Sequence, residues 1–206
     1  MVSAKRVARR KAAGFAIRAA LTRAARGLRR GAVFLLLAAP AFARERAILI
    51  YPREHWTLRP LFYTTHQRAL VQQLKKAYDV ELHEQVADEA ALFGIDVSGA
   101  KLLVLSAHGD PFAMSFAGKN ARTLDSTDRA RLAAFFAKLD PHATILLQSC
   151  ETGRGFAHLV KELAGESRRV IAAKGEIPRD GVVIGSLAPF DVTITCSDGR
   201  DCTLRL

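Results

Sequence analysis

Two short apolar segments, 102–105 and 145–147, limit the folds open to this chain. Both are continuous runs rather than alternating ones, which is the pattern of a strand covered on both faces of a sheet. After the second run, apolar residues recur at i, i+3, i+4 and i+7 from Phe156 to Leu163, which predicts a helix. We therefore expect buried parallel strands joined by crossover helices.

The rest of the chain continues this alternation of strands and helices. Further strands are predicted at 47–51, 79–83, 170–173 and 182–184, and helices at 65–78, 86–94, 126–139 and 156–165. Two alternating runs near the end, 192–196 and 202–206, predict an antiparallel hairpin. The expected fold is an α/β three-layer sandwich, α/β/α, with a mostly parallel sheet and this C-terminal hairpin.

The first 43 residues have the pattern of a secretory signal peptide. Residues 1–30 carry ten Lys or Arg and no acid, and an apolar stretch then runs from 32 to a small-x-small ending at Ala43. We expect cleavage after Ala43, leaving 44–206 as a single domain that is exported to the periplasm or secreted and not stably inserted in a membrane. An uncleaved anchor is the alternative, and the Arg29-Arg30 pair leaves a twin-arginine signal open.

The net charge argues against a nucleic-acid partner. The whole chain has a net charge of +11, but the ten basic residues of the leader account for most of it. From Arg44 onward, 21 basic residues face 20 acidic ones. Because phosphate binding depends on concentrated Lys and Arg, we expect no nucleic acid among the partners.

All three cysteines lie after the leader. Cys196 and Cys202 flank the turn sequence 197–201 between the two alternating C-terminal runs. We expect a disulfide between them, which suits an oxidising compartment; the alternative is that both are ordinary strand residues. Cys150 is then an unpaired thiol in an exported protein.

The unpaired thiol and a histidine follow the two apolar strands. Cys150 ends one strand and His108 ends the other, so both are expected at the edge of the sheet where ligands bind. A helix starting near Gly155 would favour a thiolate at Cys150. The backbone N–H groups of Gly109 and Cys150 are candidates for an oxyanion hole, and Gly109 lacks a side chain that would keep a substrate carbonyl away.

These two motifs resemble those of the caspase-like cysteine peptidases. An apolar strand leads to His108-Gly109, and another leads to Gln148-Ser149-Cys150 with Gly153 three residues later, a spacing similar to bacterial metacaspase-like members. The resemblance covers about residues 46–187. It implies a caspase-hemoglobinase fold, a Cys150/His108 dyad, hydrolysis of amide bonds in peptides or proteins through a thioester, and no cofactor.

The residues that would select a substrate are less clearly marked. No arginines match those that shape the aspartate pocket of caspases. Family members that cut after Arg or Lys carry an acid in that pocket, and Glu176 and Asp110 are the candidates here, each also explained as a loop acid. Gln148 could line the same pocket. The substrate, the P1 residue, the need for activation and the oligomeric state are left open.

Two other functions fit the same residues. One is a caspase-like scaffold that binds an extended peptide without cleaving it. The other is thiol redox chemistry at Cys150, which lacks a resolving cysteine at a nearby strand end. The other five histidines show no ligand spacing with one another or with a cysteine, so no metal site is predicted.

Overall fold

The computed structural model describes residues 43–52, 65–116, 123–178 and 180–206. Contacts divide the chain into two units, Met1–Ala43 and Arg44–Leu206, and all the described secondary structure lies in the second. Residues 1–42, which hold the predicted signal peptide, lie outside the described residues.

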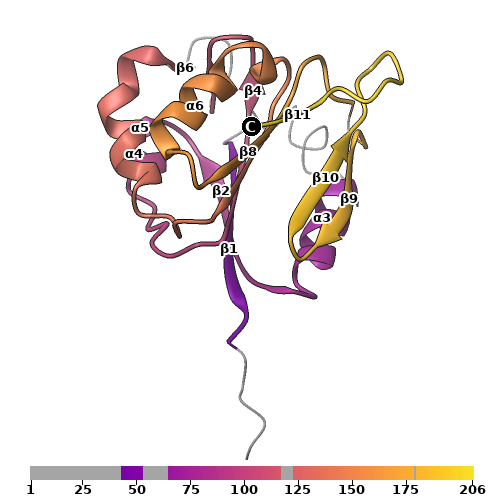
Figure 1. Cartoon of the computed structure of the whole chain (residues 1–206), viewed down its shortest axis with the longest axis horizontal. Helices are drawn as coiled ribbons and strands as arrows, with labels where there is room; N and C mark the ends of the chain where they lie inside the picture. Colours follow the sequence, from indigo (N-terminus) through magenta and orange to yellow (C-terminus); the bar gives the residue numbers. More distant parts are fainter. Residues whose placement is uncertain (1–42, 53–64, 117–122, 179) are drawn as a thin grey trace, which may run out of the picture. The chain divides into compact units, whose positions relative to one another are not determined.

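A six-stranded sheet forms the centre of the second unit (Figure 1). Its strands run in the order β11-β8-β7-β3-β1-β2, and all neighbours are parallel except β11 and β8. In chain order they are β1 (Glu45–Pro52), β2 (Tyr78–Val86), β3 (Leu102–Ser106), β7 (Thr144–Gln148), β8 (Arg169–Ala173) and β11 (Thr203–Arg205). The prediction of a mixed α/β chain with a mostly parallel sheet is confirmed.

Burial along the strands follows their place in the sheet. All five residues of β3 and the first four of β7 are buried, because both sheet faces are covered at its centre. The edge strand β2 is mostly half-buried or exposed between its buried ends, as its alternating sequence predicts. The fully apolar runs therefore occupy the centre of the sheet.

Three helices cover one face of the sheet (Figure 1). They are α4 (Glu89–Phe93), α5 (Arg129–Phe136) and α6 (Phe156–Ala164). Their apolar side chains pack on every second strand residue, for example Leu103 and Leu105 of β3 with Ile145 and Leu147 of β7. Asp88 begins α4 by accepting a hydrogen bond from the Ala91 N–H at 2.8 Å, and Gly94 caps its end.

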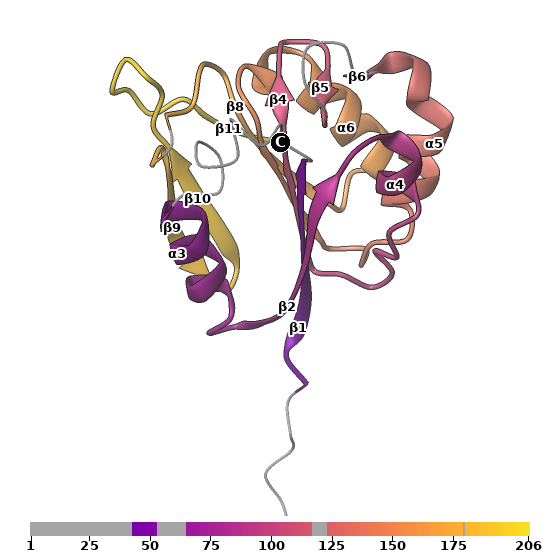
Figure 2. The ribbon, with the colours of Figure 1, turned by 180° about the vertical axis from the view of Figure 1, so that it is seen from behind.

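The opposite face is covered by a helix and a hairpin (Figure 2). The helix is α3 (Thr65–Leu74), and the hairpin joins β9 (Val182–Leu187) to β10 (Phe190–Ile194). Strand residues of the other parity face them, including Leu102 and Val104 of β3. This covering layer is therefore part helix and part antiparallel strand.

The C-terminal strands pair differently from the predicted hairpin. β10 pairs with β9, and β11 joins the main sheet beside β8. Between the two predicted arms there remain the Thr195–Asp201 bridge and the hydrogen bond from the Cys202 N–H to the Ile194 carbonyl, 2.9 Å long. The physical reason is that β8 offers a free sheet edge, which the last strand fills.

A small antiparallel sheet follows β3. It consists of β4 (His108–Gly109), β5 (Met114–Ser115) and β6 (Thr123–Leu124), in that order. The sequence 112–120, an apolar segment followed by the turn residues 118–120, predicts a small hairpin here, and this prediction falls partly on residues 117–122, outside the described residues. Two 3₁₀ turns, η1 (Ser126–Asp128) and η2 (Thr152–Arg154), precede α5 and α6.

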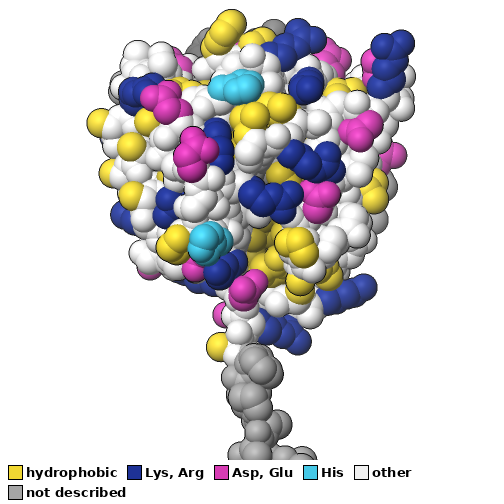
Figure 3. All heavy atoms as spheres, viewed as in Figure 1, with side chains coloured by type: hydrophobic (Ala, Val, Ile, Leu, Met, Phe, Trp, Pro, Cys, Tyr) yellow, Lys and Arg dark blue, Asp and Glu magenta, His cyan; other side chains and the backbone are white. Residues whose placement is uncertain are grey.

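The surface mixes charges of both signs. On the face drawn in Figure 3, Lys and Arg side chains are interspersed with Asp and Glu rather than gathered in one patch. Among the residues that the structure describes, no helix combines the length and the apolar character needed to cross a bilayer.

Asp191 of β10 anchors the hairpin layer to the edge of the main sheet. Its carboxylate accepts hydrogen bonds from Arg205 of β11 at 3.0 and 3.2 Å and from Arg169 of β8 at 3.3 Å. Arg205 also donates to the Val192 carbonyl at 2.8 Å. These bonds, first of all those from Arg205, lower the pKa of Asp191.

We predict that Asp191→Asn lowers the free energy of unfolding by about 1 kcal/mol at pH 7, a value reduced by the partial exposure of the pair. Because the folded-state pKa is lowered, this stabilisation is present above the unfolded-state pKa and is lost as pH falls through the folded-state value. Urea unfolding of both proteins should therefore show the difference narrowing below about pH 4.

The matched control is Glu166→Gln, because the Glu166 side chain is 98% exposed and its Lys161 partner lies 3.9 Å away. That variant should unfold like the parent at every pH. A constant difference for Asp191→Asn down to the lowest pH would contradict the role assigned to its charge.

Candidate functional site

The register between β3 and β7 places His108 and Cys150 together at one edge of the sheet. The last paired residues of these parallel strands are Ser106 and Gln148. His108 and Cys150 each lie two residues beyond that pair, at the carboxyl ends of neighbouring strands. The structure thus brings the predicted imidazole and thiol to the same edge, with His108 exposed and Cys150 half-buried.

Hydrogen bonds tie the two strand exits to each other. Ser149 Oγ donates to the Ala107 carbonyl at 2.9 Å, and the Ala107 N–H donates to the Gln148 carbonyl at 3.4 Å. Ser149 is buried and lies directly before the thiol, while Ala107 lies directly before the imidazole. The backbone is therefore fixed one residue before each of the two groups.

Gly109 is required for this close approach. A Cβ at this position would clash with Ser149 Oγ and would lie 2.7 Å from the Cys150 carbonyl oxygen and 2.9 Å from Thr152 Cγ2. From the sequence, the expected role of Gly109 is to leave an open path for a substrate carbonyl. The space that a Gly109 side chain would take is instead filled by the cysteine segment.

The helix after Cys150 begins where the sequence predicts it, with Gly155 as its N-cap and Phe156 as its first residue. Between the thiol and this helix, Glu151 adopts a left-handed conformation with φ 57° and η2 follows. The Phe156 N–H donates to the Pro111 carbonyl at 2.7 Å. This helix end is thus joined to the histidine segment.

The N–H group that reaches the thiol comes from the loop after β8. Ile177 donates its backbone N–H to Cys150 Sγ at 3.4 Å. In the same loop, the Gly175 carbonyl accepts from the Glu151 N–H at 3.0 Å and the Lys174 carbonyl accepts from Arg154 Nε at 2.8 Å. We did not predict this contact, because any residue except proline can supply a backbone N–H.

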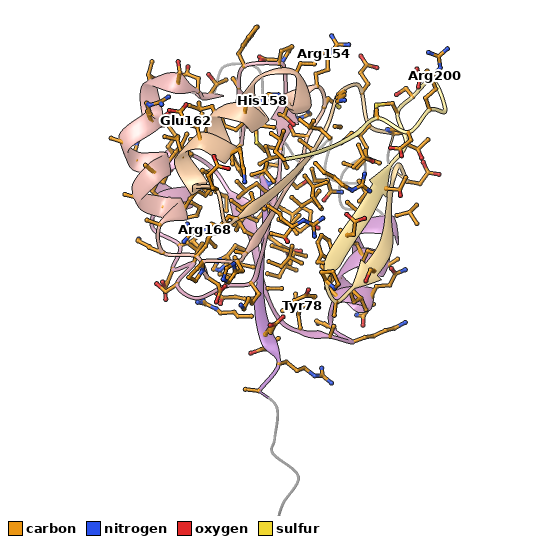
Figure 4. The ribbon with its side chains drawn as sticks, viewed as in Figure 1. Tyr78, Arg154, His158, Glu162, Arg168 and Arg200 are labelled. Carbon is orange, nitrogen blue, oxygen red and sulfur yellow. A yellow bond between two sulfur atoms is a disulfide. The ribbon has the colours of Figure 1, made fainter. Side chains whose placement is uncertain are left out.

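A pocket of about 470 Å³ lies next to the cysteine segment. Three segments line it: the turn after Cys150, the loop after β8 and the loop closed by the disulfide. The lining residues are Glu151, Arg154, Lys174, Gly175, Glu176, Cys196, Ser197, Asp198, Arg200, Asp201 and Cys202. Figure 4 labels Arg154 and Arg200, which come from the first and third of these segments.

Most charged groups of the pocket have partners nearby. Arg154 pairs with Glu151 at 2.9 Å, and Arg200 lies 3.8 Å from Asp198. Asp201 accepts hydrogen bonds from the Thr203 hydroxyl and N–H, which lower the pKa of its carboxyl group. The exposed side chains of Lys174 and Glu176 form no ion pair with the described residues.

The three predicted substrate-binding residues differ in their surroundings. Glu176 lines the pocket. Asp110 does not, and its carboxylate accepts the Phe112 and Ala113 N–H groups at 2.7 and 2.9 Å within its own turn. Gln148 has a buried side-chain oxygen that lacks a hydrogen-bond partner among the described residues, and Gln148 does not line the pocket.

The predicted disulfide is present. Cys196 and Cys202 are joined, with their Cα atoms 5.8 Å apart, and Cys150 is a free cysteine. Disulfides persist in oxidising compartments, so this pairing is compatible with export. Within the described ranges, no group of three or more His, Cys, Asp or Glu side chains is arranged to hold a metal ion.

Comparison with known proteins finds no relative. No protein-family model matches the chain, and neither a curated protein nor a solved structure is significantly similar to it. The function must therefore be inferred from the arrangement of the site itself.

We predict that Gly109→Ala lowers the free energy of unfolding by about 1–3 kcal/mol, because its Cβ would press on backbone and side-chain atoms of the cysteine segment. Urea or thermal unfolding measures the loss. Gly185→Ala is the matched control, since the nearest atom to a Cβ there lies 3.8 Å away. Equal stability of the two variants would show that Gly109 is not tightly packed.

Proposed function

We propose that the protein is an exported caspase-like cysteine peptidase. The observation that carries this proposal is the equal offset of His108 and Cys150, each two residues past the last pair of β3 and β7. A thiol and an imidazole at neighbouring strand ends form the nucleophile and base of a covalent mechanism. The cleaved signal peptide, the single domain at 44–206 and the caspase-like three-layer arrangement belong to the same proposal.

The chemistry begins when His108 takes the proton of the Cys150 thiol and Sγ attacks the carbonyl carbon of a peptide bond. The C–N bond then breaks, and His108 gives a proton to the leaving amine. Water hydrolyses the resulting thioester and restores the thiol. During both steps the backbone N–H groups of Gly109 and Cys150 would bind the negative oxygen, and the Ile177 N–H, 3.4 Å from Sγ, would stabilise the sulfur as a thiolate.

A peptide substrate has polar and apolar places to bind near this edge. The pocket of about 470 Å³ begins at Glu151, directly after the nucleophile, and contains the Glu176 carboxylate. Phe112, four residues after His108, is 75% exposed and could receive an apolar side chain.

A peptide-binding scaffold without catalysis is the second candidate. It is favoured by one observation: the residues that line the pocket include neither Cys150 nor His108. A ligand could therefore occupy the pocket without reaching the thiol. Redox chemistry at Cys150 is less well supported, because the other two cysteines are bonded to each other.

We predict that Cys150→Ala abolishes cleavage of a fluorogenic peptide library and that His108→Ala lowers kcat/KM by about 10²–10⁴, the usual contribution of an acid–base group. The matched control for the histidine is His158→Ala, since His158 is an exposed residue of α6 (Figure 4). It should leave kcat/KM unchanged.

Turnover that survives Cys150→Ala would reject the peptidase mechanism. Saturable peptide binding without any cleavage by the parent protein would instead favour the scaffold. Either conclusion requires protein that chromatography has freed of contaminating peptidases. Alkylation of Cys150 by iodoacetamide should abolish peptide cleavage by the parent protein.

A second prediction concerns the residue before the cleaved bond. The Glu176 carboxylate has no ion-pair partner among the described residues, so we expect a preference for Arg or Lys at that position. Glu176→Gln should lower kcat/KM by about two- to fivefold for such substrates and leave substrates with a neutral residue there unaffected, as one lost charge pair costs about 0.5–1 kcal/mol at an exposed side chain.

Glu166→Gln is the control, because it removes an acid whose side chain is 98% exposed and which does not line the pocket. If both types of substrate lose activity equally in Glu176→Gln, the carboxylate does not select the substrate. A parent protein that prefers an acidic residue at that position would also rule out this role.

A further inference from the structure

The disulfide packs directly on the loop that reaches Cys150. A Cβ on Gly175 would lie 2.7 Å from Cys196 Sγ, so only glycine lets this loop and the disulfide approach each other so closely. Gly175 is two residues before Ile177, whose N–H donates to Cys150 Sγ. The disulfide is therefore separated from the thiol by a single loop.

Backbone hydrogen bonds hold that loop from the disulfide side at two points. The Lys174 N–H donates to the Cys202 carbonyl at 3.0 Å, and the Ser197 N–H donates to the Glu176 carbonyl at 2.9 Å. One partner is a disulfide cysteine and the other directly follows one. The segment 174–176 is thus fixed at its beginning and its end by the disulfide loop.

The same loop is bonded to the cysteine segment on its other side. The Gly175 carbonyl accepts a hydrogen bond from the Glu151 N–H at 3.0 Å, and the Lys174 carbonyl accepts one from Arg154 Nε at 2.8 Å. The Ile177 N–H donates to Cys150 Sγ at 3.4 Å. The loop therefore lies between two walls. One wall is the disulfide loop and the other contains the candidate nucleophile.

We propose that the Cys196–Cys202 disulfide is a positioning element for Cys150: it fixes the loop 174–177 so that the Ile177 N–H points at the sulfur. This inference deepens the proposed function and rests on it in so far as Cys150 is the nucleophile. The effect on the reactivity of the thiol holds whether or not a peptide is cleaved.

The physical basis is the difference between a fixed donor and a mobile one. An N–H bonds a negatively charged sulfur more strongly than a neutral thiol, so a donor held in place stabilises the reactive form. Without the disulfide, the loop must lose conformational freedom each time the bond forms. The disulfide itself spans a sequence separation of only 6, and such short loops stabilise the whole fold least.

The test compares the parent protein with the double variant Cys196→Ser/Cys202→Ser, in which Cys150 is the only cysteine. The rate of Cys150 alkylation by iodoacetamide at one pH, located by peptide mass spectrometry, should fall about tenfold when the fixed donor is lost. Amide hydrogen exchange should become faster in 174–178 and remain unchanged in β7, which shows that the sheet stays folded.

Asp180→Asn is the matched control, because Asp180 is an exposed residue beyond the loop 174–177, does not line the pocket and leaves the disulfide in place. It should alkylate at the parental rate. An unchanged rate in the double variant would overturn the proposal. A faster rate would also overturn it, because the loop would then merely shield the half-buried thiol.

Ile177→Pro removes the N–H while both cysteines remain, and so tests the same contact if the double variant fails to fold. It should slow alkylation by a similar factor, with the disulfide still detected by mass. Combining the two changes should give no further loss, because both act through one hydrogen bond. Additive losses would mean that the disulfide acts by another route.

These measurements separate the two proposals. If the parent protein cleaves no peptide but the alkylation rates change as expected, the peptidase function fails and the positioning role stands. If peptides are cleaved by Cys150 and the double variant retains the parental alkylation rate and kcat, the positioning role fails and the peptidase function stands.

Discussion

The site depends on the parallel pairing of β3 and β7. Because the two strands end in register, at Ser106 and Gln148, the next two residues of each leave the sheet side by side. A slip of one residue would turn every side chain of one strand to the opposite face, which the separate apolar layers on the two faces oppose. The packing of the core therefore also fixes the relative positions of the imidazole and the thiol.

Close backbone contacts then complete the arrangement. Gly109 lies against Ser149 and Cys150, and Gly175 lies against Cys196. In each case a Cβ would overlap atoms of the neighbouring segment, so these two glycines allow the histidine segment to pack on the cysteine segment and the loop after β8 to pack on the disulfide. The loop after β8 then reaches the thiol through the Ile177 N–H.

The sequence predicts the sheet better than it predicts the contacts between loops. The strand 144–148, most of α6 and the disulfide follow from apolar periodicity and from turn residues, because these signals are local. The pairing of β11 with β8 cannot be predicted from such signals, because alternation identifies a strand but not the sheet edge that it joins. The hydrogen bond from the Ile177 N–H to Cys150 could not be predicted for a similar reason. Every residue except proline carries a backbone N–H, so the residue type does not indicate which one donates.

Only some of the charged side chains that line the pocket are available to select a ligand. Glu151 and Arg154 form an ion pair, and Asp201 accepts hydrogen bonds from Thr203, so these groups mainly stabilise the lining of the pocket. Lys174 and Glu176 project from the loop that also carries the Ile177 donor. A ligand that pairs with either side chain would therefore contact the same loop whose Ile177 N–H forms a hydrogen bond with the thiol. The pocket lining and the N–H that contacts Cys150 thus belong to the same four consecutive residues, 174–177, so the proposed positioning of the thiol predicts that pocket binding and thiol reactivity are coupled.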